Sequence, residues 1–236
     1  MADEAVGGED LLDDVVWHAL TTIHERFAEG GRPARRYDPE VSVFWGAPDA
    51  SEGSWGAMAD LAGPGDVVVV FRREVGTPPA GWAVEHGGTG HQLVLRRPVV
   101  PVAAPVGLRP LTVADVPEML ALVELTAPGP FAARTIELGG YVGVVEEGRL
   151  VAMAGERMAV PGHTEVSAVC THPDARRRGY GAALTAHVAA GIQARGETPF
   201  LHVVAGNDGA RRVYEQLGFT HRCDVAFAVL RPPAGA

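Results

Sequence analysis

The chain of 236 residues contains no lysine, so all 20 of its basic residues are arginine. This absence excludes chemistry that depends on a side-chain amine, including Schiff-base catalysis and the lysine that grips the phosphates of ATP. Arginine stays protonated at any working pH, so the bases of this chain bind anions and do not titrate. With 29 acidic residues the net charge is -9, which argues against nucleic acid or an anionic membrane as the main partner.

Cysteine and long apolar runs are also scarce. The two cysteines, Cys170 and Cys223, do not make a disulfide scaffold. No stretch approaches the roughly 18 uninterrupted apolar residues that a membrane span requires. The start Met1 to Glu4 lacks the basic and apolar regions of a signal peptide. We therefore expect a cytoplasmic protein without a membrane partner, either a monomer or a homodimer.

The acidic charge is uneven along the chain. Residues 1–105 carry 8 arginines against 16 acids, and residues 106–236 carry 12 against 13, so -8 of the -9 charge lies in the first half. Three prolines between 98 and 105 suit an extended connector. We predict a disordered start at 1–10, an N-terminal α/β domain at 11–97, a connector at 98–105, a second domain at 106–230 and a tail at 231–236.

Hydrophobic periodicity gives a coarse order of elements. In the first half it predicts an amphipathic helix from Leu12 that ends at Gly30, strands at 41–45 and 67–71 with a short helix at 55–61 between them, and a hairpin turn at 87–90. In the second half the predicted strands are 106–111, 141–146, 149–158, 163–171, 199–205 and 219–230, and the predicted helices are 115–125, 180–195 and 208–217.

The most informative segment is the run Arg176-Arg177-Arg178-Gly179-Tyr180-Gly181-Ala182, between a predicted strand and a predicted helix. Glycines at such a turn let the backbone approach a ligand, and free amides at a helix start favour a phosphate group. The three arginines supply positive charge. The alternative is a solvated arginine patch on a tight turn.

A second segment follows, Asn207-Asp-Gly-Ala210-Arg-Arg-Val-Tyr214-Glu-Gln-Leu217-Gly218-Phe219. Together the two segments resemble the GNAT superfamily of acyl-CoA-dependent N-acetyltransferases, over about residues 106–230, and within it the FR47-like and glycine-N-acyltransferase-like proteins. The resemblance implies a GNAT fold, an α/β protein with a mixed, mostly antiparallel sheet flanked by helices. The first half has no such loop, but its layout is similar to half of a related unit, so we expect it to be a degenerate GNAT-like half.

The resemblance also implies how acetyl-CoA, the expected cosubstrate, would bind. The loop from Arg176 to Ala182 would wrap the pyrophosphate of coenzyme A, and Asn207 would contact the pantetheine arm. The backbone of Val169, Cys170 and Thr171 would hydrogen-bond the pantetheine and polarise the thioester carbonyl. The alternative for Asn207, an ordinary N-cap, is compatible with this role because backbone and side chain point in different directions.

Tyr214 and Glu165 are the candidate catalytic residues. Tyr214 shares a helical face with Ala210 and Leu217, a pattern typical of a core tyrosine, whereas the resemblance implies that its hydroxyl faces the departing thiolate. An ordinary tyrosine has a pKa of about 10 and a thiol one of about 8.5, so full transfer of the tyrosine proton to the thiolate is unfavourable. A hydrogen bond from the hydroxyl to the thiolate is therefore the safer description.

Glu165 stands fourteen residues before Gly179, as the general-base glutamate does in the histone-acetyltransferase branch of the family. Because an ordinary glutamate is poorly matched to an amine, either burial raises its pKa or a water relay carries the proton. The alternative is a strand glutamate paired with an arginine. Glu156 and His163 are reserve candidates.

The sequence thus predicts transfer of an acetyl or short acyl group from acyl-CoA to a primary amine by direct attack, on a small-molecule or peptide acceptor. The alternative is a non-catalytic acyl-CoA sensor. The pairs Cys170-x-His172 and His221-x-Cys223 lack the usual spacing of zinc ligands, so no metal is expected. We expect the first half to form one wall of the acceptor cleft, with its surplus acid facing a cationic acceptor.

Overall fold

The computed structural model describes residues 8–233, so residues 1–7 of the predicted disordered start and 234–236 of the predicted tail lie outside that range. In chain order the elements of the first half are η1 (Glu9–Leu12, where η marks a 3-10 helix), α1 (Val15–Leu20), η2 (Glu25–Phe27), β1 (Ala28–Gly30), β2 (Arg35–Tyr37), β3 (Phe44–Gly46), α2 (Glu52–Leu61), β4 (Val68–Arg72) and β5 (Ala83–Val94). Those of the second half are β6 (Leu108–Pro110), η3 (Val113–Asp115), α3 (Val116–Thr126), η4 (Thr135–Leu138), β7 (Tyr141–Glu146), β8 (Arg149–Val160), β9 (His163–Thr171), η5 (Pro173–Ala175), α4 (Tyr180–Ala194), β10 (Thr198–Val204), α5 (Asp208–Gln216) and β11 (Thr220–Arg231).

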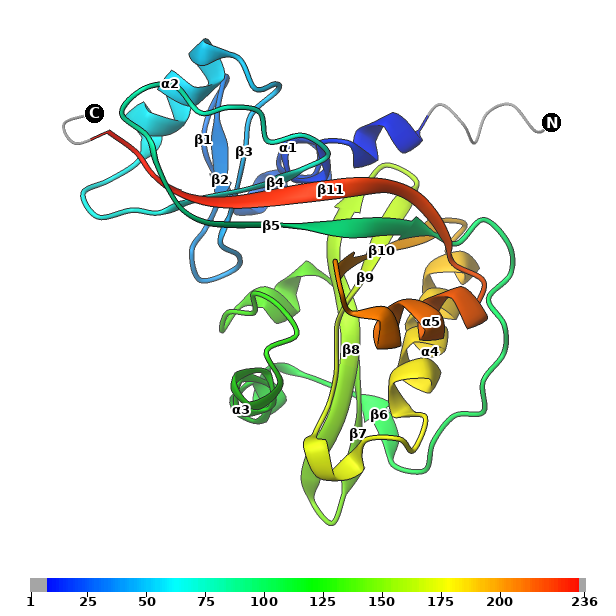
Figure 1. Cartoon of the computed structure of the whole chain (residues 1–236). Helices are drawn as coiled ribbons and strands as arrows, with labels where there is room; N and C mark the ends of the chain where they lie inside the picture. Colours follow the sequence, from blue (N-terminus) through cyan, green and yellow to red (C-terminus); the bar gives the residue numbers. More distant parts are fainter. Residues whose placement is uncertain (1–7, 234–236) are drawn as a thin grey trace.

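A single curved sheet of eleven strands runs through the molecule in the order β1-β2-β3-β4-β11-β5-β10-β9-β8-β7-β6. The pairs β9–β10 and β3–β4 are parallel, and the other neighbouring pairs are antiparallel. Helices α4 and α5 cover one side of the strands of the second half, and α3 lies on the other side (Figure 1). The predicted α/β class with a mixed, mostly antiparallel sheet flanked by helices is confirmed, and so are the elements predicted between 106 and 230.

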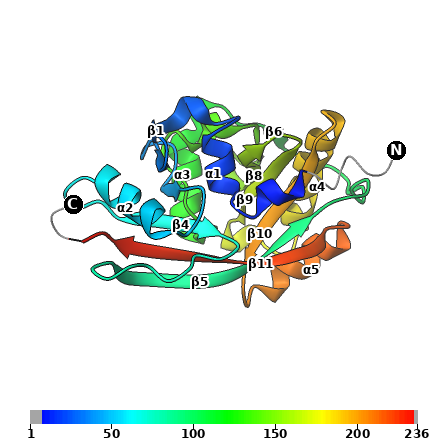
Figure 2. The same cartoon turned by 90° about the horizontal axis from the view of Figure 1, so that it is seen from above.

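The two halves of the chain meet through two long strands. Strand β5 belongs to the first half, yet it pairs with β10 on one side and with β11 on the other. Figures 1 and 2 show β5 and β11 side by side, spanning from the α2 region to the α5 region. Residues 98–105 between the halves have no regular secondary structure. The division into two domains stays a prediction, but any two units here share one sheet.

The hairpin turn predicted at 87–90 is wrong, because these residues lie inside β5. Their glycines serve the close approach of neighbouring strands instead of a turn. A Cβ added at Gly88 would lie 2.7 Å from the Phe227 ring, and one at Gly90 would lie 2.7 Å from the carbonyl oxygen of Val203. A glycine run can therefore mark crowded strand packing as well as a turn.

The long amphipathic helix predicted from Leu12 is also wrong. The chain forms η1, α1, η2 and β1 over this stretch. Helix α1 ends where the Thr21 hydroxyl donates to the carbonyl of Trp17 (2.8 Å) and Arg35 donates to the carbonyl of Leu20 (2.6 Å). The Trp17 carbonyl also accepts from the Thr21 amide, as in a helix, but Arg35 takes up the Leu20 carbonyl that a longer helix would have used.

Parts of the start predicted at 1–10 and of the tail predicted at 231–236 fall within the described residues. Within the start predicted as disordered, Glu9 forms an ion pair with Arg96 (2.7 Å). Within the predicted tail, Arg231 belongs to β11 and forms an ion pair with Glu85 (2.5 Å). Among residues 8–233, no helix is both long and apolar enough to cross a bilayer.

Candidate active site

The site lies where two parallel strands separate. Strands β9 and β10 pair over three positions only, from His163 opposite Thr198 to Glu165 opposite Phe200. Beyond them a cavity of ≈ 870 Å³ opens between the strands, which is within the size range of ligand pockets. Its lining comes from β8, from β9 and the following turn, from the start of α4, from β10 and α5, and from the end of α3: residues 126–128, 157, 166–171, 176, 181, 202–207, 209, 210, 213 and 214.

The β9 wall of the cavity contains Val169, Cys170 and Thr171, as the sequence predicts. A bulge interrupts its pairing with β8, and Ala168 at the bulge has a positive φ of 52°. In this register Ala168 and Val169 have no partner residue on β8. The residues of β9 after Glu165 have no partner residue on β10. This wall therefore offers backbone groups to a ligand. The Cys170 thiol is buried, which raises its pKa to about 11, so it is a poor nucleophile.

The arginine and glycine run forms the turn before α4. Gly179 is the N-cap of α4 at a φ of +81°, a conformation that favours glycine. Arg176 and Gly181 line the cavity. Arg178 instead forms an ion pair with Glu146 (3.0 Å), whose carboxylate also accepts a hydrogen bond from the Tyr180 hydroxyl.

The predicted cofactor residues of this run thus divide into two groups. Five of them do not line the cavity: Arg177, Arg178, Gly179, Tyr180 and Ala182. Their role in binding coenzyme A stays a prediction that rests on the backbone of the turn and the α4 start. Arg176 is the member of the run whose side chain is placed at the cavity, and no ion pair occupies it among the described residues.

Asn207 and Tyr214 approach the cavity from α5. Asn207 is the N-cap of α5, where its side-chain oxygen accepts from the Ala210 amide (3.2 Å), and it also lines the cavity. The capping interpretation is confirmed, and the position leaves the cofactor role possible. Tyr214 is 8% exposed, packs edge-on against Phe219 and lines the cavity. Burial raises its pKa to about 12.

Glu165 sits behind the point where the strands separate. Both of its carboxylate oxygens accept from Arg157 (2.8 and 2.9 Å), and His202 shares one of them at 2.8 Å. Burial opposes ionisation, but the Arg157 charge and the hydrogen bonds from His202 and Arg157 outweigh it and lower the pKa to about 2. The alternative of a strand glutamate paired with an arginine is confirmed, and the route in which burial raises the pKa of Glu165 is wrong, since the buried Arg157 faces the carboxylate. Glu165 is 1% exposed and is absent from the cavity lining, whereas Arg157 and His202 belong to it.

The residues around Glu165 were not found from the sequence. Gln92 on β5 donates from Nε2 to the carbonyl of Leu12 (3.0 Å) and lies 3.0 Å from His202 Nε2. Both nitrogens of the buried His202 ring are thereby engaged, and burial lowers its pKa, which favours the neutral ring. These partners lie 8 to 110 residues apart along the chain, so no local motif signals them.

The reserve candidates for a base lie elsewhere. Glu156 forms an ion pair with Arg195 (3.0 Å), and His163 is 5% exposed near the N-terminal segment, with burial lowering its pKa. Neither residue is part of the cavity lining.

The first half supports the cavity from behind and adds nothing to its lining. The expected acceptor-cleft wall from this half is not found at this cavity, whose lining contains no residue before Thr126 and no carboxylate. Instead, the Phe44 ring lies under the Arg157 guanidinium at 5.2 Å, and the Phe71 ring meets His202 edge-on at 4.6 Å. The surplus acid of the first half therefore does not face this cavity.

Comparison with known proteins agrees with this geometry. The family described as FR47-like protein matches residues 141–228, which include most of the cavity lining. A solved structure from Novosphingobium aromaticivorans, described as an acetyltransferase of the GNAT family, is 39% identical, covers 94% of this chain and 99% of its own, and superposes with a TM-score of 0.87. The chain belongs to the GNAT family.

More distant matches within the GNAT family differ in what they share. A GCN5-related N-acetyltransferase from Kribbella flavida is 21% identical, with a TM-score of 0.62 over 95% of this chain and 96% of that one, which shows the common fold. Mycothiol acetyltransferase of Mycobacterium avium is 43% identical over 83 residues, 31% of this chain. The match spans about a quarter (26%) of the length of that curated relative.

Proposed function

We propose that this GNAT protein transfers an acetyl or short acyl group from acyl-CoA to a primary amine by direct attack. The observation that carries the proposal is the cavity between the separated strands β9 and β10, because Tyr214, Asn207 and the unpaired edge of β9 all border it. A covalent acyl-enzyme is not part of the proposal, since the buried Cys170 thiol has a raised pKa.

The residues around the cavity fit acetyl-CoA, which supplies an activated thioester when bound. Arg176 and the free amides at the start of α4, a helix of 15 residues, suit the pyrophosphate. Asn207 and the backbone of Val169, Cys170 and Thr171 suit the amides of the pantetheine arm and the thioester carbonyl. Gly181 at the cavity wall leaves room for a ligand, because the nearest atom to an added Cβ is 3.9 Å away.

Tyr214 would act on the leaving group through a hydrogen bond. With its pKa at about 12 against about 8.5 for a thiol, full proton transfer to the thiolate would cost about 5 kcal/mol. A hydrogen bond from the neutral hydroxyl stabilises the developing thiolate without that cost.

The proton of the attacking amine would leave through water at the cavity mouth. Glu165 is a poor direct base, because its pKa is held at about 2 and it does not line the cavity. In this proposal Glu165 is a positioning residue that holds Arg157 and His202 at the cavity wall. Of the two routes that the sequence leaves open, the water relay is the one that this pairing supports.

The direct test is release of coenzyme A thiol from acetyl-CoA in the presence of a panel of small-molecule and peptide amines, with mass detection of the acetylated product. We expect turnover with at least one amine and a large loss in Tyr214→Phe. Tight binding of acetyl-CoA without turnover on any amine would contradict the proposal and favour a sensor. Cytoplasmic location, the acceptor and the oligomeric state stay predictions.

A further inference from the structure

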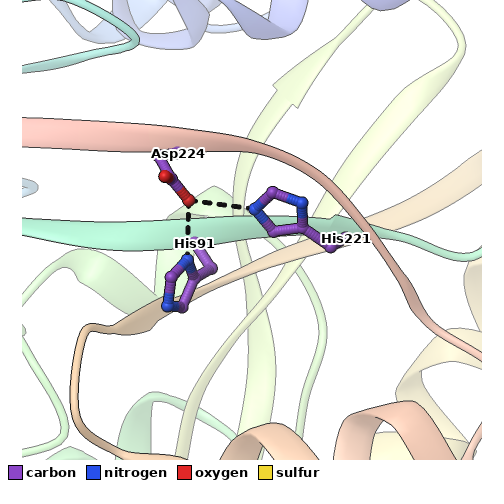
Figure 3. Close-up of side chains that lie close together, drawn as sticks. All are labelled: His91, His221 and Asp224. Atoms are coloured by element: carbon purple, nitrogen blue, oxygen red, sulfur yellow. Dashed lines mark hydrogen bonds and ion pairs between the residues drawn. The ribbon is translucent and has the colours of Figure 1, made fainter.

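Two imidazoles and a carboxylate converge outside the proposed active site, on strands β5 and β11. His91 Nδ1 lies 2.7 Å and His221 Nε2 lies 2.9 Å from the same oxygen, Oδ1 of Asp224. Figure 3 shows both rings directed at this carboxylate, His91 from β5 and the other two residues from β11. None of the three lines the active-site cavity.

A β-bulge places the three side chains together. His221 and Asp224 are three residues apart, a spacing that puts side chains on opposite faces of a regular strand. Between His221 and Cys223 the register with β5 shifts by one residue, so Leu93 pairs with His221, Gln92 with Cys223 and His91 with Asp224. The extra residue returns His221 and Asp224 to the same face, where His91 lies directly across.

The neighbouring side chains point away from this cluster. Gln92, next to His91, is buried and bonds His202 and the carbonyl of Leu12. Arg222, the extra residue of the bulge, donates to Gln92 (2.9 Å) and to Asp13 (2.7 Å). The Cys223 sulfur also lies toward Gln92. The Arg222 cation is therefore directed away from His91, His221 and Asp224.

We propose that His91, His221 and Asp224 form a binding site for a zinc ion. Imidazole nitrogens and a carboxylate oxygen are ligands that zinc accepts, and three protein ligands leave a fourth position for water. The three ligand atoms lie within 4.8 Å of one another. Ligands of a tetrahedral zinc stand about 3.4 Å apart, so on binding the carboxylate oxygen would move away from both nitrogens, and the two imidazole nitrogens would adjust their spacing to the ion.

The site also needs little rearrangement to bind an ion. Its ligands stand on paired strands and already converge, so little ordering is needed on binding. The side chain of His91 is 24% exposed, and those of His221 and Asp224 are 41% and 72% exposed, which gives the ion an entry path. Because β5 belongs to the first half and β11 to the second, a bound ion would clamp the two halves together.

The test is calorimetric titration of zinc into the tag-free, chelator-treated full chain. We expect one equivalent to bind, and we expect Asp224→Asn and His221→Ala each to weaken binding by at least about tenfold. His86→Ala is the matched control, because His86 is another exposed histidine of β5 that packs on Phe227 and lies outside the cluster. It should bind as the unaltered protein does.

A thermal readout guards against variants that fail to fold. In chelator the conservative Asp224→Asn protein should melt near the unaltered protein, and zinc should raise the melting temperature of the unaltered protein but not of this variant. Absence of saturable zinc binding in the unaltered protein would overturn the proposal. Zinc affinity that is equal in the unaltered protein and in both variants would also overturn it.

Discussion

The two halves of the chain share one sheet but contribute differently to the cavity. Every residue of the cavity lining belongs to the second half, from Thr126 to Tyr214. The first half reaches the same place from behind, where Phe44, Phe71 and Gln92 pack on Arg157 and His202. A ligand in this cavity therefore meets the second half, while the first half fixes the side chains of the wall.

The comparison also explains the uneven charge. Many acids of the first half form ion pairs, some within that half, such as Arg36 with Asp66 and Arg72 with Asp14 (both 2.5 Å), and some with arginines of the second half, such as Arg134 with Asp38. The cavity lining has arginines at 157 and 176 and no carboxylate. The negative net charge of the chain therefore reflects the surface and packing of the first half and does not indicate the charge of the ligand.

The largest effect is expected for Glu165→Gln, which tests whether the two halves depend on each other for stability. Removal of the carboxylate charge leaves Arg157 buried without its counter-ion, so we expect a loss of about 3–5 kcal/mol in the free energy of unfolding. All four tryptophans (Trp17, Trp45, Trp55 and Trp82) lie in the first half, so their fluorescence should report this loss if the halves unfold together. The matched control is Glu215→Gln, an exposed pair with Arg211, which should change stability by less than about 0.5 kcal/mol. If the unfolding transition followed by tryptophan fluorescence were unchanged in Glu165→Gln, the two halves would not unfold together.

The same ion pair predicts acid sensitivity. The folded-state pKa of Glu165 is lowered from 4.5 to about 2, so its contribution to stability is fully present above about pH 4.5 and is lost as the pH falls toward 2. Melting temperatures measured across this window should fall more steeply in the unaltered protein than in Glu165→Gln. Equal slopes would show that the carboxylate does not gain its low pKa from folding.

Tyr214→Phe should separate catalysis from structure in the second half. The hydroxyl borders the cavity while the ring packs on Phe219, so the variant keeps the packing. We expect kcat to fall by about 10- to 100-fold, the range of a lost transition-state hydrogen bond, with the melting temperature and the KM for acetyl-CoA little changed. Full kcat in the variant would remove Tyr214 from the mechanism.

Gln92→Leu probes how the first half supports the wall. Gln92 is fully buried and bonds Leu12, His202 and Arg222, so leaving these partners unsatisfied should cost about 1–3 kcal/mol of stability. If Gln92 holds the His202 ring in place at the cavity wall, the KM for the acceptor should rise more in Gln92→Leu than the KM for acetyl-CoA. Steady-state kinetics with each substrate varied in turn distinguishes this outcome, and an unchanged acceptor KM would make Gln92 purely structural.

Arg176→Ala should give the smallest effect. Its exposed charge borders the cavity, so we expect the KM for acetyl-CoA to rise by about three- to tenfold, with a weaker dependence on salt. Arg212→Ala serves as the control, because Arg212 is exposed on α5 outside the cavity lining. Equal effects of the two substitutions would reduce the role of Arg176 to general surface charge.

Local patterns predicted the elements of the second half well and those of the first half in part, because β3, α2 and β4 lie where two strands and a helix were expected, whereas the long helix from Leu12 and the turn at 87–90 do not form. Strands and helices between 141 and 231 follow clear periodicity with glycine turns, and the resemblance led to Asn207 and Tyr214. The insertion of β5 between β10 and β11 and the network of Arg157, Glu165 and His202 depend on contacts between distant segments. Neither local propensity nor spacing encodes such contacts, so the sequence allowed an arginine partner for Glu165 but did not indicate Arg157, His202 or Gln92.

In the proposed function, the second half alone holds the cosubstrate. Hydrogen–deuterium exchange with and without acetyl-CoA tests it directly, because a bound ligand slows exchange of the amides that it covers. We predict protection at residues 166–171, 179–183 and 203–210, and unchanged exchange in β1 to β4. Protection across residues 28–72 with none at 166–171 would contradict the account.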